Sequence, residues 1–184
     1  MTFRISESSK KILLNVARTS VENFLKTGKE TKFNFREDDL SVIRSVFVTL
    51  WEKDSGELRG CIGNIKAVLS LVEEVSKNAI SSAFNDPRFV PLTKNEIKNI
   101  RIELNVLSPL KKILPDEIEI GKHGLYLIYK SYSSLFLPEV AVSQRWSLIE
   151  FLDELSLKAG LNKEEWKNPK VKLFGFESES WIEN

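Results

Sequence analysis

The residues of this chain that are best suited to chemistry lie in one hexapeptide, Leu58–Gly63, with the sequence LRGCIG. It holds Cys61, the only cysteine among 184 residues, between Gly60 and Gly63 and two positions after Arg59. On a regular strand Arg59, Cys61 and Gly63 share one face, because alternate side chains point to the same side. A neighbouring guanidinium favours the thiolate, and glycines allow close approach to the backbone. The hexapeptide therefore predicts a place where a ligand binds or a thiol reacts.

A second interpretation of the same segment stays open. A lone cysteine in a strand is commonly a small buried hydrophobic residue rather than a nucleophile. A β-bulge at Gly60 or Gly63 would also break the alternation and separate the side chains of Arg59 and Cys61. Both outcomes would leave the hexapeptide with a structural role.

His123 is the second candidate for chemistry. It is the only histidine, so it is the only side chain whose unperturbed pKa suits acid–base work near neutrality. Beside Cys61 it could form a thiolate–imidazolium pair, and Glu103 is an alternative proton-transfer group. The competing interpretation is a turn histidine bonded to the backbone. Lys122 alongside disfavours the imidazolium and so argues against the pair.

The segment Asp86–Phe89 follows a predicted helix and adds a further charged pair. Asp86 can close an Asx turn onto the following backbone, and Arg88 can pair with Asp86 or with Glu103. A structural role is the stronger interpretation for this segment. The complete set of predicted binding residues is Arg59, Gly60, Cys61, Gly63, Arg88 and Glu103.

Composition and missing motifs exclude several classes of function. The 27 Lys and Arg against 26 Asp and Glu leave a net charge of +1, so neither nucleic acid nor a membrane is an expected partner. One cysteine and one histidine exclude a disulfide and multi-Cys or paired-His metal sites. Phosphate-loop, dinucleotide-binding, EF-hand and serine-elbow motifs are missing. We therefore expect no metal and no cofactor.

We expect no secretory signal at the start of the chain. Met1–Ser6 turns polar at once, which does not fit a secretory signal. No apolar run approaches the roughly 18–20 residues needed to span a bilayer. We therefore expect a cytoplasmic protein, and the sequence leaves its oligomeric state open.

Hydrophobic periodicity and capping signals predict an α+β fold. The strands come as hairpins rather than as βαβ units, which favours antiparallel sheets. Capping boxes at Thr93 with Glu96 and at Ser147 with Glu150 mark helix starts, and Asn162 with Glu165 marks a short helix that holds Trp166. The predicted elements are helices at Ser6–Lys26, Ser70–Phe84 and 148–159, and strands at Ser45–Trp51, Leu58–Gly63, Ile100–Leu107, Leu125–Tyr129, Ser134–Leu137 and Val171–Phe176.

Five segments together resemble the AMMECR domain family, which is named for a human chromosomal region linked to Alport syndrome, midface hypoplasia and elliptocytosis. They occur in the family's order and cover nearly the whole chain. The hexapeptide is the family's hallmark, and the size of the chain resembles the stand-alone archaeal and bacterial members. The segments are Leu58–Gly63, Ala83–Phe89, Ile120–Leu125, Leu137–Val140 and Lys158–Leu161, the last followed by Trp166.

The resemblance implies two subdomains, each an antiparallel sheet with flanking helices, and a cleft between them that the hexapeptide faces. The larger subdomain would contain residues 1–36 and 100–184, and the smaller one residues 37–99. Family members are associated with a radical-SAM enzyme and a dioxygenase-like protein, which implies a shared modification pathway.

Two functions follow from these observations, and the sequence leaves open whether the protein is an enzyme. The first is a binding module whose cleft grips a protein or another large substrate, with a radical-SAM enzyme as one partner. The alternative is an enzyme with Cys61 as nucleophile, Arg59 lowering its pKa, and His123 or Glu103 transferring the proton.

Overall fold

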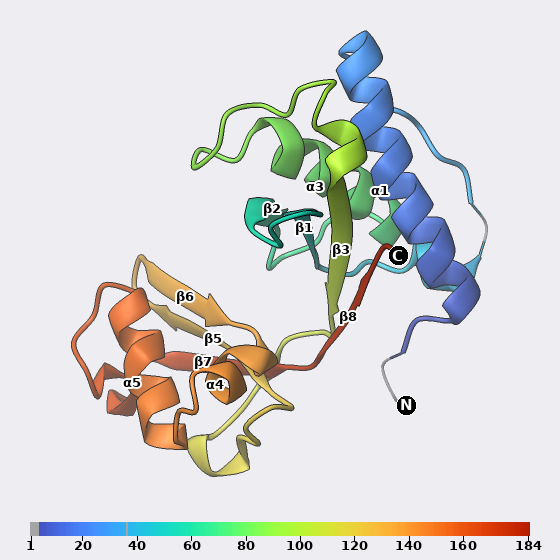
Figure 1. Cartoon of the computed structure of the whole chain (residues 1–184). Helices are drawn as coiled ribbons and strands as arrows, with labels where there is room; N and C mark the ends of the chain where they lie inside the picture. Colours follow the sequence, from blue (N-terminus) through green and yellow to red (C-terminus); the bar gives the residue numbers. More distant parts are fainter. Residues whose placement is uncertain (1–3, 36) are drawn as a thin grey trace. The chain divides into compact units, whose positions relative to one another are not determined.

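The computed structural model describes residues 4–35 and 37–184 (Figure 1). Met1–Phe3, part of the polar start discussed above, and Arg36 lie outside the described residues. Internal contacts divide the chain into two compact units. We call residues 1–107 with 179–184 unit 1, and residues 108–178 unit 2.

Unit 1 is built on a four-stranded antiparallel sheet with the strand order β2-β1-β3-β8. The last strand, β8, comes from the C-terminal end of the chain and adds the fourth strand beside β3. The elements are α1 (Glu7–Thr27), α2 (Asp38–Ser41), β1 (Val46–Glu52), β2 (Leu58–Gly63), α3 (Leu71–Phe84), the 3-10 turn η1 (Ile97–Asn99), β3 (Ile100–Leu107) and β8 (Ser178–Ile182).

Unit 2 has its own four-stranded antiparallel sheet, with the order β4-β7-β5-β6. Its separate core forms where α5 packs against this sheet, around Leu127, Phe151 and Leu155. The elements are β4 (Lys111–Lys112), η2 (Pro115–Glu117), β5 (Gly124–Tyr129), β6 (Tyr132–Phe136), α4 (Pro138–Ser143), α5 (Leu148–Lys158), η3 (Glu165–Lys167) and β7 (Lys172–Phe176).

The ends of the two long helices of unit 1 follow from local sequence. The Ser6 hydroxyl caps α1 by accepting a hydrogen bond from the Ser9 N–H, and Gly28 ends the helix in the left-handed region with φ of 68°. At the start of α3 the Glu73 carboxylate accepts the Ser70 N–H at 3.1 Å, as a capping box requires. These signals confirm both predicted helices to within one residue at each end.

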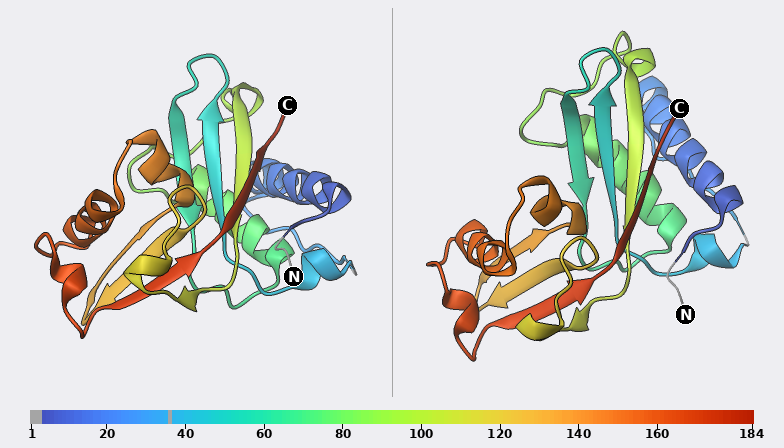
Figure 2. Two further views of the ribbon diagram at one scale, coloured as in Figure 1. Left: turned by 90° about the horizontal axis from the view of Figure 1, so that it is seen from below. Right: turned by 60° about the horizontal axis from the view of Figure 1, so that its bottom comes forward.

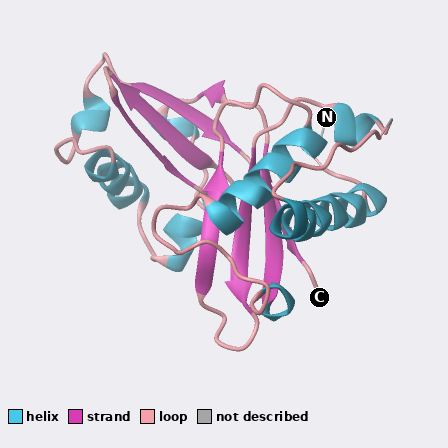
Figure 3. Ribbon diagram, turned by 90° about the horizontal axis from the view of Figure 1, so that it is seen from above, coloured by secondary structure: helices cyan, strands magenta, loops and turns pink. Residues whose placement is uncertain are grey.

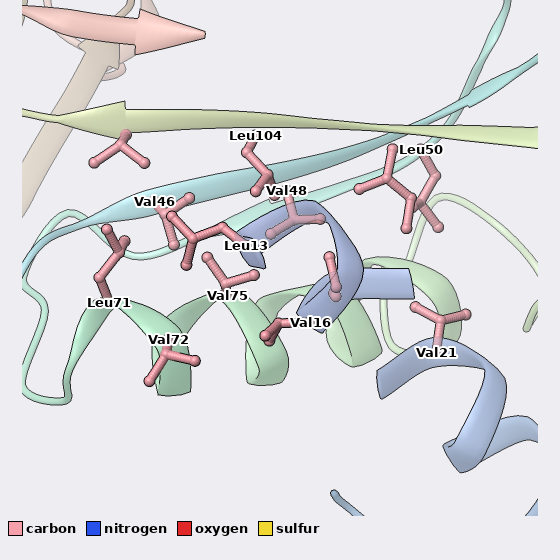
Figure 4. Packing of buried hydrophobic residues seen from close by; sticks show 14 of the residues in the cluster. Leu13, Val16, Val21, Val46, Val48, Leu50, Leu71, Val72, Val75 and Leu104 are labelled. Carbon is pink, nitrogen blue, oxygen red and sulfur yellow. The ribbon is translucent and has the colours of Figure 1, made fainter. Parts of the chain in front are cut away.

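The main core of unit 1 lies between its sheet and the pair α1 and α3. The two helices run side by side over one face of the strands (Figures 2 and 3). Leu13 and Val16 of α1 and Val75 of α3 meet Val48 of β1 and Leu104 of β3 (Figure 4). All five side chains are fully buried, so each contributes on the order of 1.5–3 kcal/mol of apolar burial.

Two polar side chains of α3 reach through this core to the backbone of the sheet. Asn78 Nδ2 donates to the Val46 carbonyl at 3.0 Å. The Ser82 hydroxyl donates to the Val48 carbonyl at 2.7 Å and accepts the Ile62 N–H at 2.9 Å. Ser82 thereby joins β1 and β2 to the helix through one buried oxygen, and α3 is fixed at a definite height above the sheet.

The predicted fold class is confirmed, as are most of the predicted elements. The strands Leu58–Gly63 and Ile100–Leu107 have the predicted bounds, because strict alternation and turn residues define both. The strand β8 was missed, since its serine and glutamate residues give no strand pattern. Contacts with β3 fix its position, and just past its end the Glu183 N–H donates to the Ile102 carbonyl of β3 at 2.9 Å. Also missed were α2, β4 and α4.

The two units do not coincide with the expected subdomains, 1–36 with 100–184 and 37–99. The observed divisions follow Leu107 and Ser178. The reason is that β3 pairs with β1 along its whole length and α1 packs on α3. The segment 37–99 therefore shares one core with residues on both sides of it.

The bridging role of Ser82 gives a direct test of the helix–sheet contact. Replacing Ser82 with Ala leaves a buried carbonyl without this donor, so the free energy of unfolding should fall by about 1–3 kcal/mol in urea denaturation. Ser81→Ala makes the same change one position along the helix and should stay within about 0.5 kcal/mol of the parent. Equal losses in the two variants would contradict the role assigned to Ser82.

Candidate functional site around the hexapeptide strand

The pairing of β2 with β1 changes register at Arg59. Gly60 lies opposite Leu50, whereas Leu58 lies opposite Trp51. Arg59 is therefore the extra residue of a β-bulge, which is the alternative that the sequence left open. Its side chain does not follow the strand alternation.

The Arg59 side chain holds the loop that follows α3. It is buried, and its Nε donates to Glu96 Oε1 at 2.8 Å while Nη2 donates to the Val90 carbonyl at 2.9 Å. This ion pair lowers the pKa of Glu96 to about 2. The same carboxylate accepts the N–H and the hydroxyl of Thr93, which is one half of the predicted capping box, whereas η1 itself has Glu96 as its N-cap and no side-chain cap. Arg59 is thus committed to Glu96 and is not the cation that activates Cys61.

At both glycines of the hexapeptide, other parts of the protein occupy the space that a side chain would take. A Cβ added to Gly60 would lie 2.1 Å from the carbonyl oxygen of Ser82 on α3. One added to Gly63 would lie 2.4 Å from the ring of Phe47 on β1. The close approach predicted for both positions is present, and the approaching groups are a helix backbone and a cross-strand aromatic ring. Gly60 is therefore the residue that lets α3 reach the sheet.

Cys61 lies on the face of the sheet that points away from α1 and α3. It is opposite Thr49, whose hydroxyl donates to the sulfur at 3.3 Å. Burial raises the pKa of the Cys61 thiol, and this effect outweighs the opposing hydrogen bond from Thr49 and the charge of Arg88. The nearby carboxylates of Asp86 and Glu103 raise the pKa further. Cys61 is therefore a protonated thiol at neutral pH, in contrast to the thiolate predicted from Arg59.

A carboxylate–guanidinium pair clamps the backbone of Cys61. The buried Asp86 carboxylate accepts the Cys61 N–H at 2.8 Å and binds Arg88 through Nε at 2.9 Å and Nη2 at 2.6 Å. Arg88 Nη2 also donates to the Cys61 carbonyl at 3.2 Å. The Asp86 carboxylate accepts the Arg88 N–H at 3.1 Å, which confirms the predicted Asx turn. These hydrogen bonds, those from Arg88 first, hold the pKa of Asp86 far below its usual range.

The Asp86–Arg88 pair, which we call the clamp, occupies the backbone hydrogen-bonding groups of one residue on an open sheet edge. β2 is the outermost strand, and an edge strand offers unpaired N–H and C=O groups to any further strand. At Cys61 both groups are taken by Asp86 and Arg88. The Asp86 side chain is 1% exposed and that of Arg88 is 55% exposed, so the pair is anchored at one end and open to solvent at the other.

Glu103 lies on the same face of the sheet as Cys61. Thr49 of β1 is opposite Cys61 on one side and opposite Glu103 of β3 on the other. Trp51, two positions further along β1, is opposite Arg101. The Glu103 carboxylate accepts the Trp51 indole N–H at 2.7 Å. Of the predicted site residues, the structure therefore brings together Cys61, Arg88 and Glu103, while it turns Arg59 and Gly60 to structural contacts.

Three residues of this face were not predicted to belong to the site. Asp86 was predicted to form a turn. Its contact with the hexapeptide strand could not be predicted, because Asp86 and Cys61 lie 25 residues apart in the chain. Thr49 and Trp51 belong to the predicted strand Ser45–Trp51, and the alternation of side chains along that strand was the available signal for both.

His123 lies in unit 2 and has the contacts of a turn histidine. The ring Nδ1 of His123 accepts the Glu119 N–H at 3.1 Å, and the backbone N–H of His123 donates to the Glu119 carbonyl at 3.0 Å. Since Cys61 belongs to unit 1 and His123 to unit 2, a pair between them stays a prediction.

Across residues 4–35 and 37–184, no group of three or more His, Cys, Asp or Glu side chains is arranged to hold a metal ion. In the same part of the chain, no helix combines the length and the apolar character needed to cross a membrane.

The two antiparallel sheets and the hexapeptide strand define a class of α+β domain, and comparison with known proteins gives its family. The chain belongs to the AMMECR1 family, whose model matches residues 14–181. The segments that carried the resemblance therefore identified the family correctly.

Similar proteins come from archaea. Protein MK0488 of Methanopyrus kandleri is 38% identical, over 93% of this chain and 86% of its own length. A protein of Sulfurisphaera tokodaii is 40% identical, over 94% of this chain and 81% of its own length. The crystal structure of Pyrococcus horikoshii PH0010 matches with a TM-score of 0.90 and 36% identity, over 99% of this chain and 95% of that one. None of these three names states an activity.

The Arg59–Glu96 pair makes stability depend on pH in a defined direction. Because the folded pKa of Glu96 is about 2 against an ordinary value of 4.5, its contribution is complete above pH 4.5 and is lost as the pH falls toward 2. Glu96→Gln should therefore lose less stability than the parent between about pH 6 and pH 3 in urea denaturation. Glu57→Gln, at the exposed turn after β1, serves as the control and should behave as the parent does. Identical losses for the parent and Glu96→Gln would refute the assignment.

Proposed function

We propose that this chain is a binding module, and that the hexapeptide strand with Arg88 and Glu103 contacts a protein or another large substrate. The observation that carries the proposal is the clamp at Cys61. It holds an exposed guanidinium in one position through a buried carboxylate. A charged group that is already ordered loses little conformational entropy on binding, so Arg88 is prepared to meet an acidic group or a carbonyl.

The neighbouring side chains suit a protein interface. Trp51 and Phe47 are half-buried on the same face as Cys61, and tryptophan and arginine are the residue types that most often dominate binding energy. Glu103 fixes the Trp51 ring through its indole N–H. A fixed aromatic ring beside a fixed guanidinium favours recognition over chemistry.

The family resemblance implies an association with a radical-SAM enzyme. We propose on that basis that this chain acts as an accessory to such an enzyme in a modification pathway.

An enzyme with Cys61 as nucleophile is the second candidate. Two observations favour it: the Thr49 hydroxyl and the Arg88 charge both lower the pKa of the thiol. Burial outweighs them, and Arg59, the predicted activating cation, binds Glu96 instead. The proton-transfer partner would be Glu103, or His123 if the two units brought it to Cys61.

Variants of the exposed face separate these two functions. We expect Arg88→Ala to weaken binding to the radical-SAM enzyme about tenfold or more in calorimetry, while Lys77→Ala on the exposed side of α3 stays at the parent value. Glu103→Gln keeps an acceptor for Trp51 and removes the charge, so it tests the face even if Arg88→Ala folds poorly.

The control for catalysis is Cys61→Ser. As a binding module the protein should keep its partner affinity and support the pathway in this variant. Full binding together with complete loss of pathway function would favour the enzyme. Unchanged affinity in folded Arg88→Ala and in Glu103→Gln would contradict the binding face.

A further inference from the structure

Unit 2 contains a groove that plays no part in the site described above. It has a volume of about 800 Å³ and is lined by residues 112–115 and 166–173. The first segment runs from β4 into η2, and the second runs through η3 into β7. This volume lies within the range of roughly 300–1,000 Å³ that is usual for ligand sites.

The floor of the groove is apolar and packs against the hydrophobic core of unit 2. Ile113, Trp166, Val171 and Leu173 are half-buried and pack against the core of unit 2. The Trp166 indole N–H donates to Asp153 at 2.8 Å, which fixes the ring. A supported apolar floor offers a preformed surface for aliphatic or aromatic side chains of a ligand.

The rim of the groove is cationic. Lys112, Lys167, Lys170 and Lys172 are all exposed, and the described lining residues include no aspartate or glutamate. Lys167 pairs with Glu164 outside the groove. Within the described chain, the ammonium groups of the other three have no carboxylate within 4 Å. Like charges gathered on one rim repel one another, and an anionic ligand would relieve that repulsion.

We propose that this groove binds an acidic peptide segment of a partner protein, with apolar side chains on the floor and carboxylates at the lysine rim. Charge complementarity and the mixed lining support this occupant. Among the described lining residues Trp166 is the single aromatic one, and the Lys167 ammonium lies 5.2 Å from its ring centroid. A series of stacked bases needs several aromatic platforms, so the lining favours a peptide over single-stranded nucleic acid.

The edge of the unit 2 sheet adds a means of orienting the peptide. β4 covers only the far end of β7, with Lys111 opposite Gly175 and Lys112 opposite Phe174. The Ile113 N–H reaches the Leu173 carbonyl at 3.3 Å, and the chain then turns away into η2. An extended peptide could continue the line of β4 beside the start of β7, which is a common mode of peptide recognition.

Fluorescence anisotropy with defined probes tests the proposal on the full chain. The first probe is a fluorescein-labelled peptide of ten residues in which glutamate flanks leucine and phenylalanine, and the second has serine at the apolar positions. The third probe is a ten-nucleotide oligothymidylate. We expect the first probe to bind about tenfold more tightly than the other two, because it alone offers both carboxylates and apolar groups.

Matched variants locate the binding. Lys170→Glu with Lys172→Glu should weaken the first probe about tenfold or more, since it reverses the rim charge. Lys29→Glu with Lys163→Glu makes the same change in net charge at exposed lysines outside the lining and should have an effect of less than about threefold. Leu114→Ser, at a residue that is 62% exposed, should weaken the first probe and leave the second unchanged.

Three results would overturn the proposal. Equal binding of all three probes would show attraction of any polyanion. Tighter binding of the oligonucleotide, lost in the rim variant, would assign the groove to nucleic acid. Failure of the first probe to bind below about 1 mM would show that the groove does not hold an acidic peptide. None of these results bears on the Arg88 face, which lies in unit 1.

Discussion

The close contact between α3 and the first sheet is the constraint on which unit 1 depends. A helix backbone can lie this near a strand only where the strand lacks a side chain, and Gly60 provides that position opposite Ser82. The Ser82 hydroxyl then bonds both β1 and β2. The height of α3 in turn places Asp86, the second residue past its end, beside the Cys61 backbone.

The hexapeptide therefore divides into a structural half and an exposed half. Arg59, at the bulge, holds the loop after α3, and Gly60 allows the close approach of α3 itself. Cys61 faces the opposite side of the sheet together with Arg88 and Glu103. This division explains why the segment is rich in unusual residue types without forming a complete catalytic group. Burial keeps the thiol protonated, and the Asp86 clamp gives Arg88 a fixed position.

Local signals in the sequence were sufficient for the fold class, the family and most of the elements, although α2, α4, β4 and β8 were missed. The strand β2 and the capped helix α3 were predicted because glycine turns, alternation and capping residues act over a few positions. The bulge at Arg59 could not be chosen from sequence, because it depends on Glu96, which lies 37 residues away in the chain. The same reason hid the groove of unit 2, whose two lining segments are separated in the chain by β5, β6, α4 and α5.

The central claim is that the hexapeptide recognises a partner and that Cys61 does not act as a nucleophile. The rate of alkylation of Cys61 by iodoacetamide, measured across pH, tests this most directly. We predict a rate at pH 7 below that of a free cysteine thiol, and a rate that still rises with pH beyond the ordinary thiol pKa of about 8.5, because burial raises the pKa of Cys61. A rate well above that of free cysteine, already maximal at pH 6–7, would show a thiolate and contradict the account.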